Sequence, residues 1–545
     1  MILSMGERMK KYYINRYTLW MIMAIIMGAL SQPLVAYAFA SFDSIYSVNN
    51  IDIKISDFYT EIFIIALAMI FSSFSHIVKN FISNIQMNNL RKDIFRAILG
   101  KSPNDFHRKD SGEYYNYVLK KVDTWQSGYY DQAWNIIQQI MELICIFILV
   151  FYINNIAGFI CIVVLIPLVL NNIIFPRIIG YAYNDYLEQD SKMIVKLKEF
   201  LAGFNVIKFN LAENVYSKKL NFFFDRANKC NQKISFLNNL SGSFANICVV
   251  ISQAGGVGIS LVLMLKGIIG IGHFIALTHL LSYANEPVIN LINSSVSYAS
   301  IKSINRELSE QLAEKNTKSN FENKEIVNMV QKLKLCNVTY KYTEKQNYIF
   351  SNFSQTFVMG KKYLIIGESG SGKSTLVKIL MGLIKDIEGS ISLNNDKIIQ
   401  EDMYKIVGFV PQDVFIFDDT IRNNIDLLNK YTDNEVEEVI ERTQLSKFVK
   451  SKLEGMNCKI NEEVLQVSGG ERARIGLARV MLDNRPIVIL DEILSSLDSE
   501  NAYKVEKNIL ELQNKIVIHI AHKSSSELLN QYDQVIDLGF QKNLN

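Results

Sequence analysis

The most constraining feature of this sequence of 545 residues is a set of six long apolar stretches, all within residues 1–300. Each contains about 18 or more mostly apolar residues, the length that an α-helix needs to cross a hydrocarbon core of roughly 30 Å. The sequence therefore predicts six transmembrane helices embedded in a lipid membrane. The six stretches cover Leu19–Phe39, Ile62–Ile82, Ile136–Ile153, Ala157–Ile178, Ala245–Leu265 and Ile268–Ile289.

Composition and charge narrow the class of protein further. Hydrophobic residues make up 49% of the chain and charged residues only 20%, whereas about 25% of a typical soluble domain is charged. The net charge of +3 is far from the strongly basic balance of a nucleic-acid-binding domain, so no nucleic-acid partner is expected. The six cysteines lie far apart, and their spacing predicts neither a disulfide framework nor a zinc site.

Lys and Arg residues are concentrated in two of the segments that connect the spans. Residues 83–135 contain eight of them and residues 179–244 contain nine, whereas the first connection, residues 42–60, has only Lys54. Because positively charged loops stay in the cytoplasm, we expect both long loops and both termini to be cytoplasmic. The protein is predicted to be a multi-pass protein of the cell membrane.

The two long loops have helical periodicity, and we expect the membrane helices to continue into them. Turn residues occur mainly in two short islands, Gly100–Gly112 and Ala202–Asn210, and the loop tips are expected near Pro103–Asp110 and Phe204–Asn210. A polar stretch after Ile301 has no apolar face to bury and predicts a linker. We expect residues 1–306 to form the transmembrane domain, residues 307–329 the linker and residues 330–545 a second domain.

From Leu333 onward, short β-rich runs alternate with helical stretches. This alternation is typical of an α/β domain with a mostly parallel sheet, in which chemistry takes place at the carboxyl ends of the strands. The predicted fold class is therefore a membrane α-helical domain of six transmembrane helices plus an α/β P-loop nucleoside triphosphatase domain.

A glycine-rich segment, GESGSGKST, follows the apolar run YLII and precedes a helical stretch that is expected at Leu376–Leu383. Its pattern, GxxxxGKS, lets backbone N–H groups surround phosphate oxygens, while Lys373 neutralises the β- and γ-phosphates and Ser374 ligates Mg²⁺. ATP and Mg²⁺ are the expected cofactors. The residues expected to bind ATP here are Gly367, Glu368, Ser369, Gly370, Ser371, Gly372, Lys373, Ser374 and Thr375.

Two further motifs suit the same chemistry. Asp491 and Glu492 end the apolar run IVIL, where a metal ligand and a water-orienting base are needed beside a phosphate loop. We assign the metal to Asp491 and the base to Glu492. Farther upstream, Ser468, Gly469 and Gly470 open a helix, so their N–H groups form a second anion-binding end.

The segment VSGGERARIGLAR resembles the signature of the ATP-binding cassette (ABC) family, usually LSGGQ, and the whole chain resembles an ABC exporter half-transporter. The resemblance implies that the signature of one cassette meets the ATP held by a second cassette, so that two nucleotides are sandwiched between two protomers. One departure from the pattern is Glu471, which replaces the usual glutamine.

Other residues match the family pattern by position. The resemblance implies that Tyr342 stacks on adenine, with Tyr340 as a competing candidate. It also implies that Gln412 contacts Mg²⁺ and senses the membrane domain, and that His522 reaches the γ-phosphate, whereas His519 belongs to its strand. In the membrane half, the two loop tips would be the coupling helices that press on cassettes.

The expected function is ATP-driven export of an amphipathic solute, such as a peptide, a lipid or a drug-like compound, by a dimer. A homodimer is favoured because the chain carries every catalytic element, and a heterodimer remains open. An importer of the same fold, and a membrane ATPase that regulates a partner without transport, are the alternatives. Because fewer than 20 residues precede the first span, we expect no N-terminal peptidase domain.

Polar residues within the spans are candidates for a transport pathway, because they are costly to bury in lipid. His76, Lys79 and Glu286 are expected near the inner boundary, where a solvated structural role is at least as plausible as contact with a substrate. His279 and Gln32 are expected to lie deeper, and we favour these two as pathway residues.

Overall fold

The computed structural model describes residues 7–46, 55–106, 111–313, 330–342, 348–384, 386–394, 396–397, 403–461, 467–521 and 528–539. The chain divides into two compact units. The first combines Met1–Gly100 with Lys109–Lys315, and the second combines Lys101–Arg108 with Asn316–Asn545.

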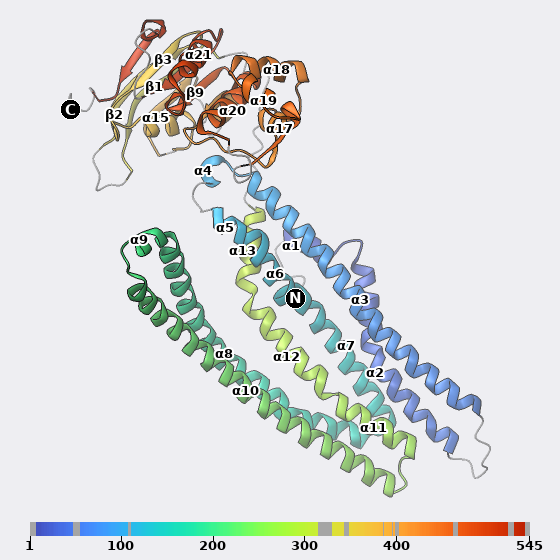
Figure 1. The fold of residues 1–545 in the computed structure, drawn as a ribbon. Helices are drawn as coiled ribbons and strands as arrows, with labels where there is room; N and C mark the ends of the chain where they lie inside the picture. Colours follow the sequence, from blue (N-terminus) through green and yellow to red (C-terminus); the bar gives the residue numbers. More distant parts are fainter. Residues whose placement is uncertain are drawn as a thin grey trace. The chain divides into compact units, whose positions relative to one another are not determined.

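The first unit is built of helices, several of them much longer than a membrane is thick (Figure 1). Two short π-helical turns, Tyr117–Lys121 and Gln126–Tyr130, continue the helical path between residues 111 and 153. The α-helices are α1 (Glu7–Tyr13), α2 (Thr18–Tyr46), α3 (Ile55–Leu99), α5 (Ser111–Asn116), α6 (Val122–Trp125), α7 (Asp131–Ile153), α8 (Asn155–Ala202), α9 (Phe204–Phe209), α10 (Glu213–Leu265), α11 (Ile271–Tyr283), α12 (Asn285–Ser300) and α13 (Lys302–Ala313).

Four helical segments in the described part of the chain are long and apolar enough to cross a membrane: Thr18–Ser41, Phe58–Leu99, Gly112–Ile153 and Glu213–Leu265. They contain four of the six predicted spans. The predicted fourth span lies within α8, a continuous helix of 48 residues that begins with the apolar stretch Asn155–Pro167.

The predicted sixth span is not one helix. It is divided into α11 and α12 at Ala284. Pro287 accounts for the division, because it has no N–H to donate to the carbonyl group of Tyr283 four residues earlier. A proline in the first turn of α12 is tolerated, since the N–H groups of that turn have no partner within the helix.

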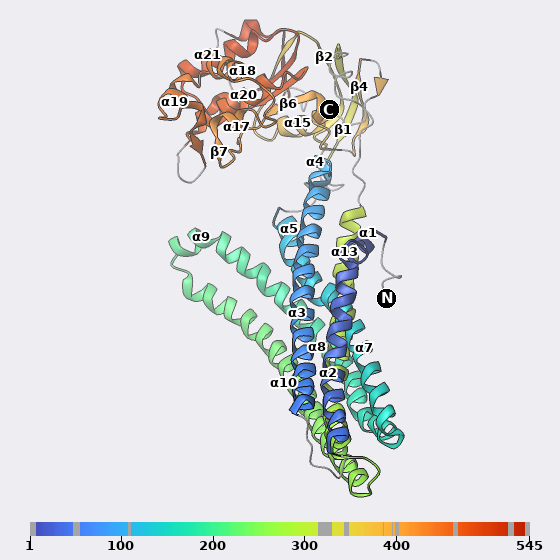
Figure 2. The ribbon, with the colours of Figure 1, turned by 90° about the vertical axis from the view of Figure 1, so that its right-hand side faces the viewer.

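Helices α8 and α10 run side by side and are joined at their far end by the short helix α9, as both views show (Figures 1 and 2). Gly203 and Asn210 flank α9, and no side chain of α9 is buried within the chain. The tip predicted at Phe204–Asn210 therefore does contain a short helix. At the other predicted tip, Pro103–Phe106 forms α4, which groups with the second unit, and residues 107–110 lie outside the described residues.

The predicted linker begins later than expected. Residues 307–313 belong to α13, in which Leu308 is completely buried and the Trp125 indole N–H donates to Asn305 at 2.9 Å. The linker prediction missed the apolar face formed by Ile304, Leu308 and Leu312, which recur every four residues among polar side chains, because the predicted linker begins only at residue 307. Residues 314–329 lie outside the described residues.

The second unit contains a parallel sheet of five strands in the order β11-β3-β10-β9-β6 and an antiparallel sheet in the order β2-β1-β4-β5. A third, two-stranded sheet pairs β7 with β8. The strands are β1 (Lys332–Tyr340), β2 (Phe350–Val358), β3 (Lys362–Ile366), β4 (Glu388–Leu393), β5 (Asp396–Lys397), β6 (Val407–Val410), β7 (Asp419–Thr420), β8 (Lys459–Ile460), β9 (Ile487–Asp491), β10 (Ile516–Ile520) and β11 (Gln534–Asp537).

Helices pack on the parallel sheet, whose central strands are buried on both faces. This burial explains the continuous apolar runs of β9 and β10. Besides α4, the helices of this unit are α15 (Lys373–Leu380), α16 (Met403–Ile406), α17 (Ile421–Ile425), α18 (Asp433–Arg442), α19 (Ser446–Lys450), α20 (Gly469–Leu482) and α21 (Ser499–Leu510).

The predicted fold class is confirmed, with one refinement: the sequence did not indicate that β1, β2, β4 and β5 form a separate antiparallel sheet, in which β1 lies between β2 and β4.

Candidate nucleotide-binding site

The order of the parallel strands brings the predicted chemical groups to one edge of the sheet. Strands β3, β10, β9 and β6 are neighbours, and all run in the same direction. The glycine-rich loop follows β3, Asp491 ends β9, and Gln412 comes two residues after the end of β6. Groups that are far apart in sequence therefore meet where the strands end.

The glycine-rich loop wraps around the ammonium group of Lys373. Lys373 is the first residue of α15 and is 6% exposed, and its Nζ donates to the carbonyl oxygens of Gly367 at 2.6 Å and Glu368 at 3.3 Å. The N-terminal turn of α15 therefore carries both a lysine and backbone N–H groups without partners in the helix, which together suit an anion.

Two positions in this loop require glycine. Gly372 has a φ of 105°, and a Cβ there would lie 2.8 Å from Cγ2 of Ile349. At Gly367 a Cβ would lie 2.6 Å from the Ser371 hydroxyl. That hydroxyl is buried and lacks a hydrogen-bond partner within the described chain, so the loop holds a polar group that a phosphate oxygen could satisfy.

Tyr342 and Tyr340 both lie near this loop. The Tyr342 hydroxyl is 3.2 Å from Oγ1 of Thr375, and half of the side chain is exposed. The ring of Tyr340 packs edge-on against that of Tyr342, with centroids 5.2 Å apart. The more exposed ring, that of Tyr342, offers the larger surface for stacking.

Gln412 and Glu492 interact directly, although 80 residues separate them. The Nε2 group of Gln412 donates to Oε2 of Glu492 at 3.3 Å. Glu492 has a φ of 52°, a strained conformation for a residue other than glycine. Its N–H donates to the carbonyl oxygen of Ile520 at the end of β10, which holds the turn after β9 in place.

Asp491 lies at the more buried end of this group. Burial raises the pKa of the Asp491 carboxyl, Glu492 raises it further, and Lys373 acts in the opposite direction. A carboxylate whose charge is disfavoured by burial and by a like charge gains most from a nearby cation.

Ser468 caps α20 through a reciprocal pair of hydrogen bonds with Glu471. The Ser468 N–H donates to the Glu471 carboxylate at 2.8 Å, and the Glu471 N–H donates to the Ser468 hydroxyl at 3.3 Å. The N–H groups of Gly469 and Gly470 lie in the first turn, where no intrahelical acceptor exists. Because Glu471 stands where the family usually has glutamine, a carboxylate lies at the N-terminus of α20, the second anion-binding end that the sequence predicts.

Two histidines, His519 and His522, lie in or just after β10. His522 lies outside the described residues. His519 is fully buried in β10, with its Nδ1 2.6 Å from the Tyr532 hydroxyl, which in turn donates to Glu506 at 2.8 Å. His519 thus belongs to the strand and to a buried hydrogen-bonded chain behind the site, as expected.

Sequence reasoning missed Arg479, which links the segment after Gln412 to α20. Its guanidinium donates to the carbonyl oxygens of Asn424 at 2.5 Å and Phe415 at 2.8 Å, and to the Asn424 carboxamide at 3.1 Å. An arginine within an otherwise apolar helical stretch was the available signal, because a half-buried guanidinium needs several acceptors.

Two family models match the chain. One, described as ABC transporter transmembrane region, matches residues 18–288, and the other, described as ABC transporter, matches residues 350–495. Together they cover most of the sequence and correspond to the helical unit and to the unit with the parallel sheet.

Among curated proteins, the chain is 30% identical over 359 residues to a mitochondrial iron-sulfur clusters transporter of Kluyveromyces lactis, a match that covers 61% of this chain and 48% of that protein. It is 36% identical over 212 residues to an ATP-dependent lipid A-core flippase of Aliivibrio fischeri, covering 37% and 36% of the two chains. The chain thus spans between about a third and a half of the length of these relatives.

The fold also resembles a solved structure over nearly its whole length. A bacterial Atm1-family ABC exporter with ATP bound superposes with a TM-score of 0.80 over 96% of this chain and 94% of that chain, at 18% sequence identity. At that identity, the likeness concerns the fold alone.

Proposed function

This chain belongs to the ABC transporter family, and on that premise we propose that it is one half of a dimeric, ATP-driven exporter of an amphipathic solute. The observation that carries the proposal is the Gln412–Glu492 hydrogen bond of 3.3 Å at the strand ends, beside the loop that holds Lys373. Residues suited to ATP hydrolysis, in a chain with membrane-spanning helices, favour an ATP-driven transporter over a membrane protein without ATPase activity.

ATP would bind in the glycine-rich loop. The backbone N–H groups of residues 367–375 and the Lys373 ammonium would contact the β- and γ-phosphates. The unpartnered Ser371 hydroxyl supports this assignment, because a phosphate oxygen would give it a partner. Tyr342 would stack on the adenine, since half of its surface is exposed close to the loop.

Mg²⁺ would be held by Ser374, Gln412 and Asp491, whose hydroxyl, carboxamide and carboxylate oxygens are the hard ligands that this ion prefers. When bound, the ion neutralises charge on the transferring phosphate. The raised pKa of Asp491 agrees with the role, because a cation would compensate the cost of its burial.

Hydrolysis would depend on Glu492 as the base that orients the attacking water. The hydrogen bond from Gln412 to Oε2 restrains this carboxylate, and restraint of a catalytic group in its working position lowers the entropic part of the barrier. We assign His522 to the γ-phosphate on the match to the family pattern alone.

A second chain is required for a complete site. The signature helix α20 would offer the N–H groups of Gly469 and Gly470 and the hydroxyl hydrogen of Ser468 to an ATP held by the partner's cassette, as the resemblance to the family implies. We propose a homodimer, because this chain carries its own base, metal ligands and signature, and a heterodimer is the alternative.

Export is favoured over import by the names of two relatives, a putative export ATP-binding/permease protein of Rickettsia typhi and the lipid A-core flippase of Aliivibrio fischeri. The protein is a multi-pass membrane protein. From the distribution of Lys and Arg we propose that both termini are cytoplasmic.

The proposal is tested by Glu492→Gln in the full chain, reconstituted in lipid nanodiscs. The variant is expected to bind ATP like the wild type and to lose hydrolysis by roughly 10²–10⁴-fold, the usual contribution of a general base. Glu500→Gln is the matched control, since Glu500 lies exposed on α21 and pairs with Lys504. Wild-type turnover in Glu492→Gln would refute the assignment of the base.

A further inference from the structure

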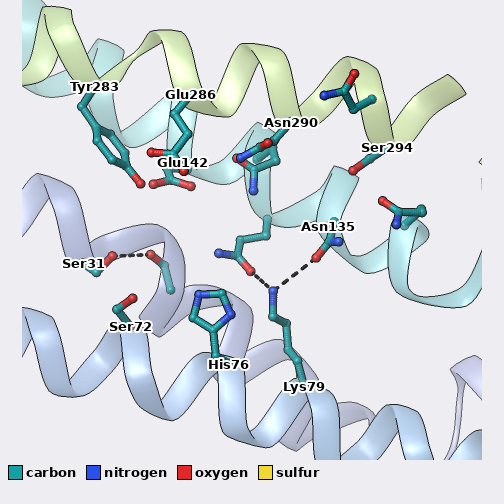
Figure 3. A pocket seen from close by; sticks show the side chains of 15 residues that line it. Ser31, Ser72, His76, Lys79, Asn135, Glu142, Tyr283, Glu286, Asn290 and Ser294 are labelled. Carbon is teal, nitrogen blue, oxygen red and sulfur yellow. Dashed lines mark hydrogen bonds between the residues drawn. The ribbon is translucent and has the colours of Figure 1, made fainter. Parts of the chain in front are cut away.

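The helical unit contains a cavity of about 350 Å³ that is lined by side chains of α2, α3, α7, α11 and α12. Its volume lies at the lower end of the range of about 300–1,000 Å³ that is typical of small-molecule sites. Figure 3 shows that the charged side chains around it come from different helices and point toward a shared space.

Two carboxylates lie together at one end of this cavity. Glu142 of α7 is only 3% exposed, and Glu286 of α12 lies beside it (Figure 3). The Tyr283 hydroxyl contacts Glu142. A buried carboxylate next to a second carboxylate is unfavourable unless positive charge compensates the pair. Lys79 is within electrostatic reach of Glu142 but also of Asp131, so the single ammonium group leaves this end of the cavity complementary to a further cation.

Lys79 of α3 lies at the other end. Its Nζ donates to the carboxamide oxygens of Gln138 at 2.6 Å and Asn135 at 3.2 Å. An ammonium group has three donors, so one more hydrogen bond can go to an acceptor within the cavity. The two hydrogen bonds hold Lys79 on the far side of the space from Glu286 (Figure 3).

The rest of the lining is polar. Six of the fifteen lining residues carry carboxamides, and none carries an aliphatic side chain. Carboxamides both donate and accept hydrogen bonds, and such a surface gives no advantage to an acyl chain or to another hydrocarbon group. The cavity therefore suits the polar end of a ligand.

We propose that this cavity binds the polar end of an amphipathic amine, with the ligand's ammonium group between Glu142 and Glu286 and a hydrogen-bond acceptor of the same ligand on Lys79. The inference rests on the proposed export function and specifies its substrate class. It also changes the expected pathway: Lys79 and Glu286 line the cavity, whereas His279 packs against Phe39 and Tyr283 and is not part of the lining, nor is Gln32.

The test uses the full chain in nanodiscs without nucleotide, with dansylcadaverine as the probe and its N-acetylated form as the neutral counterpart. Fluorescence polarisation measures both affinities. We expect the amine to bind at least roughly tenfold more tightly than the acetylated form, the usual gain of a hydrogen bond to a charged partner. Glu142→Gln and Glu286→Gln should each remove most of this preference.

Glu188→Gln is the matched control, because Glu188 pairs with Lys192 on the exposed surface of α8 and does not line the cavity. If Glu142→Gln fails to fold, Glu286→Gln still decides, since Glu286 is exposed in the single chain. The same measurements with methylammonium chloride and sodium chloride as competitors, at equal ionic strength, show whether the site selects an amine.

Equal affinity for the two probes would overturn the proposal, as would an amine preference that survives both glutamine variants or equal competition by sodium. These outcomes are independent of the motor. If Glu492→Gln retains full ATP turnover, the proposed function fails but the binding result without nucleotide stands. If turnover depends on Glu492 but the chain shows no preference for the amine, only the proposed amine site fails.

Discussion

The nucleotide site of the second unit and the polar cavity of the first are assembled in different ways. Around the glycine-rich loop, the groups that would contact ATP are largely backbone N–H groups and side chains at the ends of neighbouring parallel strands. In the cavity, the groups are side chains of five separate helices, α2, α3, α7, α11 and α12, and the lining residues range in the sequence from Gly28 to Ser294.

This difference has a physical consequence. Backbone donors in a loop are fixed by local conformation, so the site depends on a few glycines and on the helix that follows. Charged side chains within helices are fixed only by the packing of one helix on another, so the cavity can change its specificity without any change in the helical fold. Four predictions test this contrast, in order of decreasing effect.

The largest effect is expected for Lys373→Ala. Loss of the ammonium group removes the charge that the glycine-rich loop surrounds, and ATP turnover should fall by at least roughly 100-fold. Lys361→Ala is the control, because Lys361 is an exposed cassette lysine paired with Asp533, and turnover should be unchanged. Steady-state ATPase assays in nanodiscs measure the turnover of both variants. A similar loss of turnover in Lys361→Ala would contradict a specific role for Lys373 in the glycine-rich loop.

A second prediction concerns the two-chain nature of the nucleotide site. Lys373→Ala and Ser468→Arg chains should each be inactive alone, whereas their mixture should regain activity, because one composite site of each mixed dimer carries neither lesion. With random pairing, roughly a quarter of the sites are intact. ATPase assays on co-expressed, differently tagged chains measure this. No recovery in purified mixed dimers would contradict the sandwich, and wild-type chain that is active only with a different half-transporter would contradict the homodimer.

The buried chain behind the site predicts a pH dependence of stability. Tyr532 donates its hydrogen to Glu506, so His519 donates from Nδ1, and its buried Nε2 has no partner among the residues that the structure describes. Burial lowers the pKa of His519 to about 4. In the unfolded chain His519 has a pKa of about 6.5 and therefore binds more protons than it does in the folded chain. The free energy of unfolding that the neutral histidine contributes is fully present above about pH 6.5 and is lost as the pH falls toward about 4. The loss is about 2 kcal/mol at pH 5.

Hydrogen exchange of the β10 amides in the full chain measures this loss between pH 7 and pH 5. His519→Gln should flatten the pH dependence, since glutamine does not titrate. An unchanged slope in that variant would assign the pH dependence to other groups and would show that this part of the cassette is insensitive to its buried histidine.

The smallest effect is expected for Glu471→Gln. A carboxylate at the N-terminus of α20 opposes an incoming phosphate, and charge effects at helix ends are worth about 0.3–1 kcal/mol, so the ATP concentration for half-maximal turnover should fall by roughly two- to fivefold. Glutamine can keep the reciprocal cap with Ser468. Glu435→Gln is the control, because Glu435 forms the same cap with Thr432 on α18. A higher ATP requirement in Glu471→Gln would show that the carboxylate assists binding.

Much of the nucleotide site could be predicted from the sequence, because its parts are local. The glycines before Lys373, the serine that caps α20 and the carboxylates after β9 each occur within a few residues of the element that positions them. The α/β alternation then implies that strand ends meet at one edge. The hydrogen bond between Gln412 and Glu492 follows from that topology once β6 and β9 are neighbours.

What the sequence determined by itself was therefore the apolar length of the membrane helices, the alternation of strands and helices, and the short motifs whose backbone geometry is local. Only the tertiary structure decided that Pro287 divides the last span, that Leu308 of the expected linker is buried, that β1 and β4 form a separate sheet, and that Glu142, Glu286 and Lys79 share one cavity. Periodicity records which face of an element is apolar, but which elements meet depends on packing between residues far apart in the chain, and that packing leaves no local pattern.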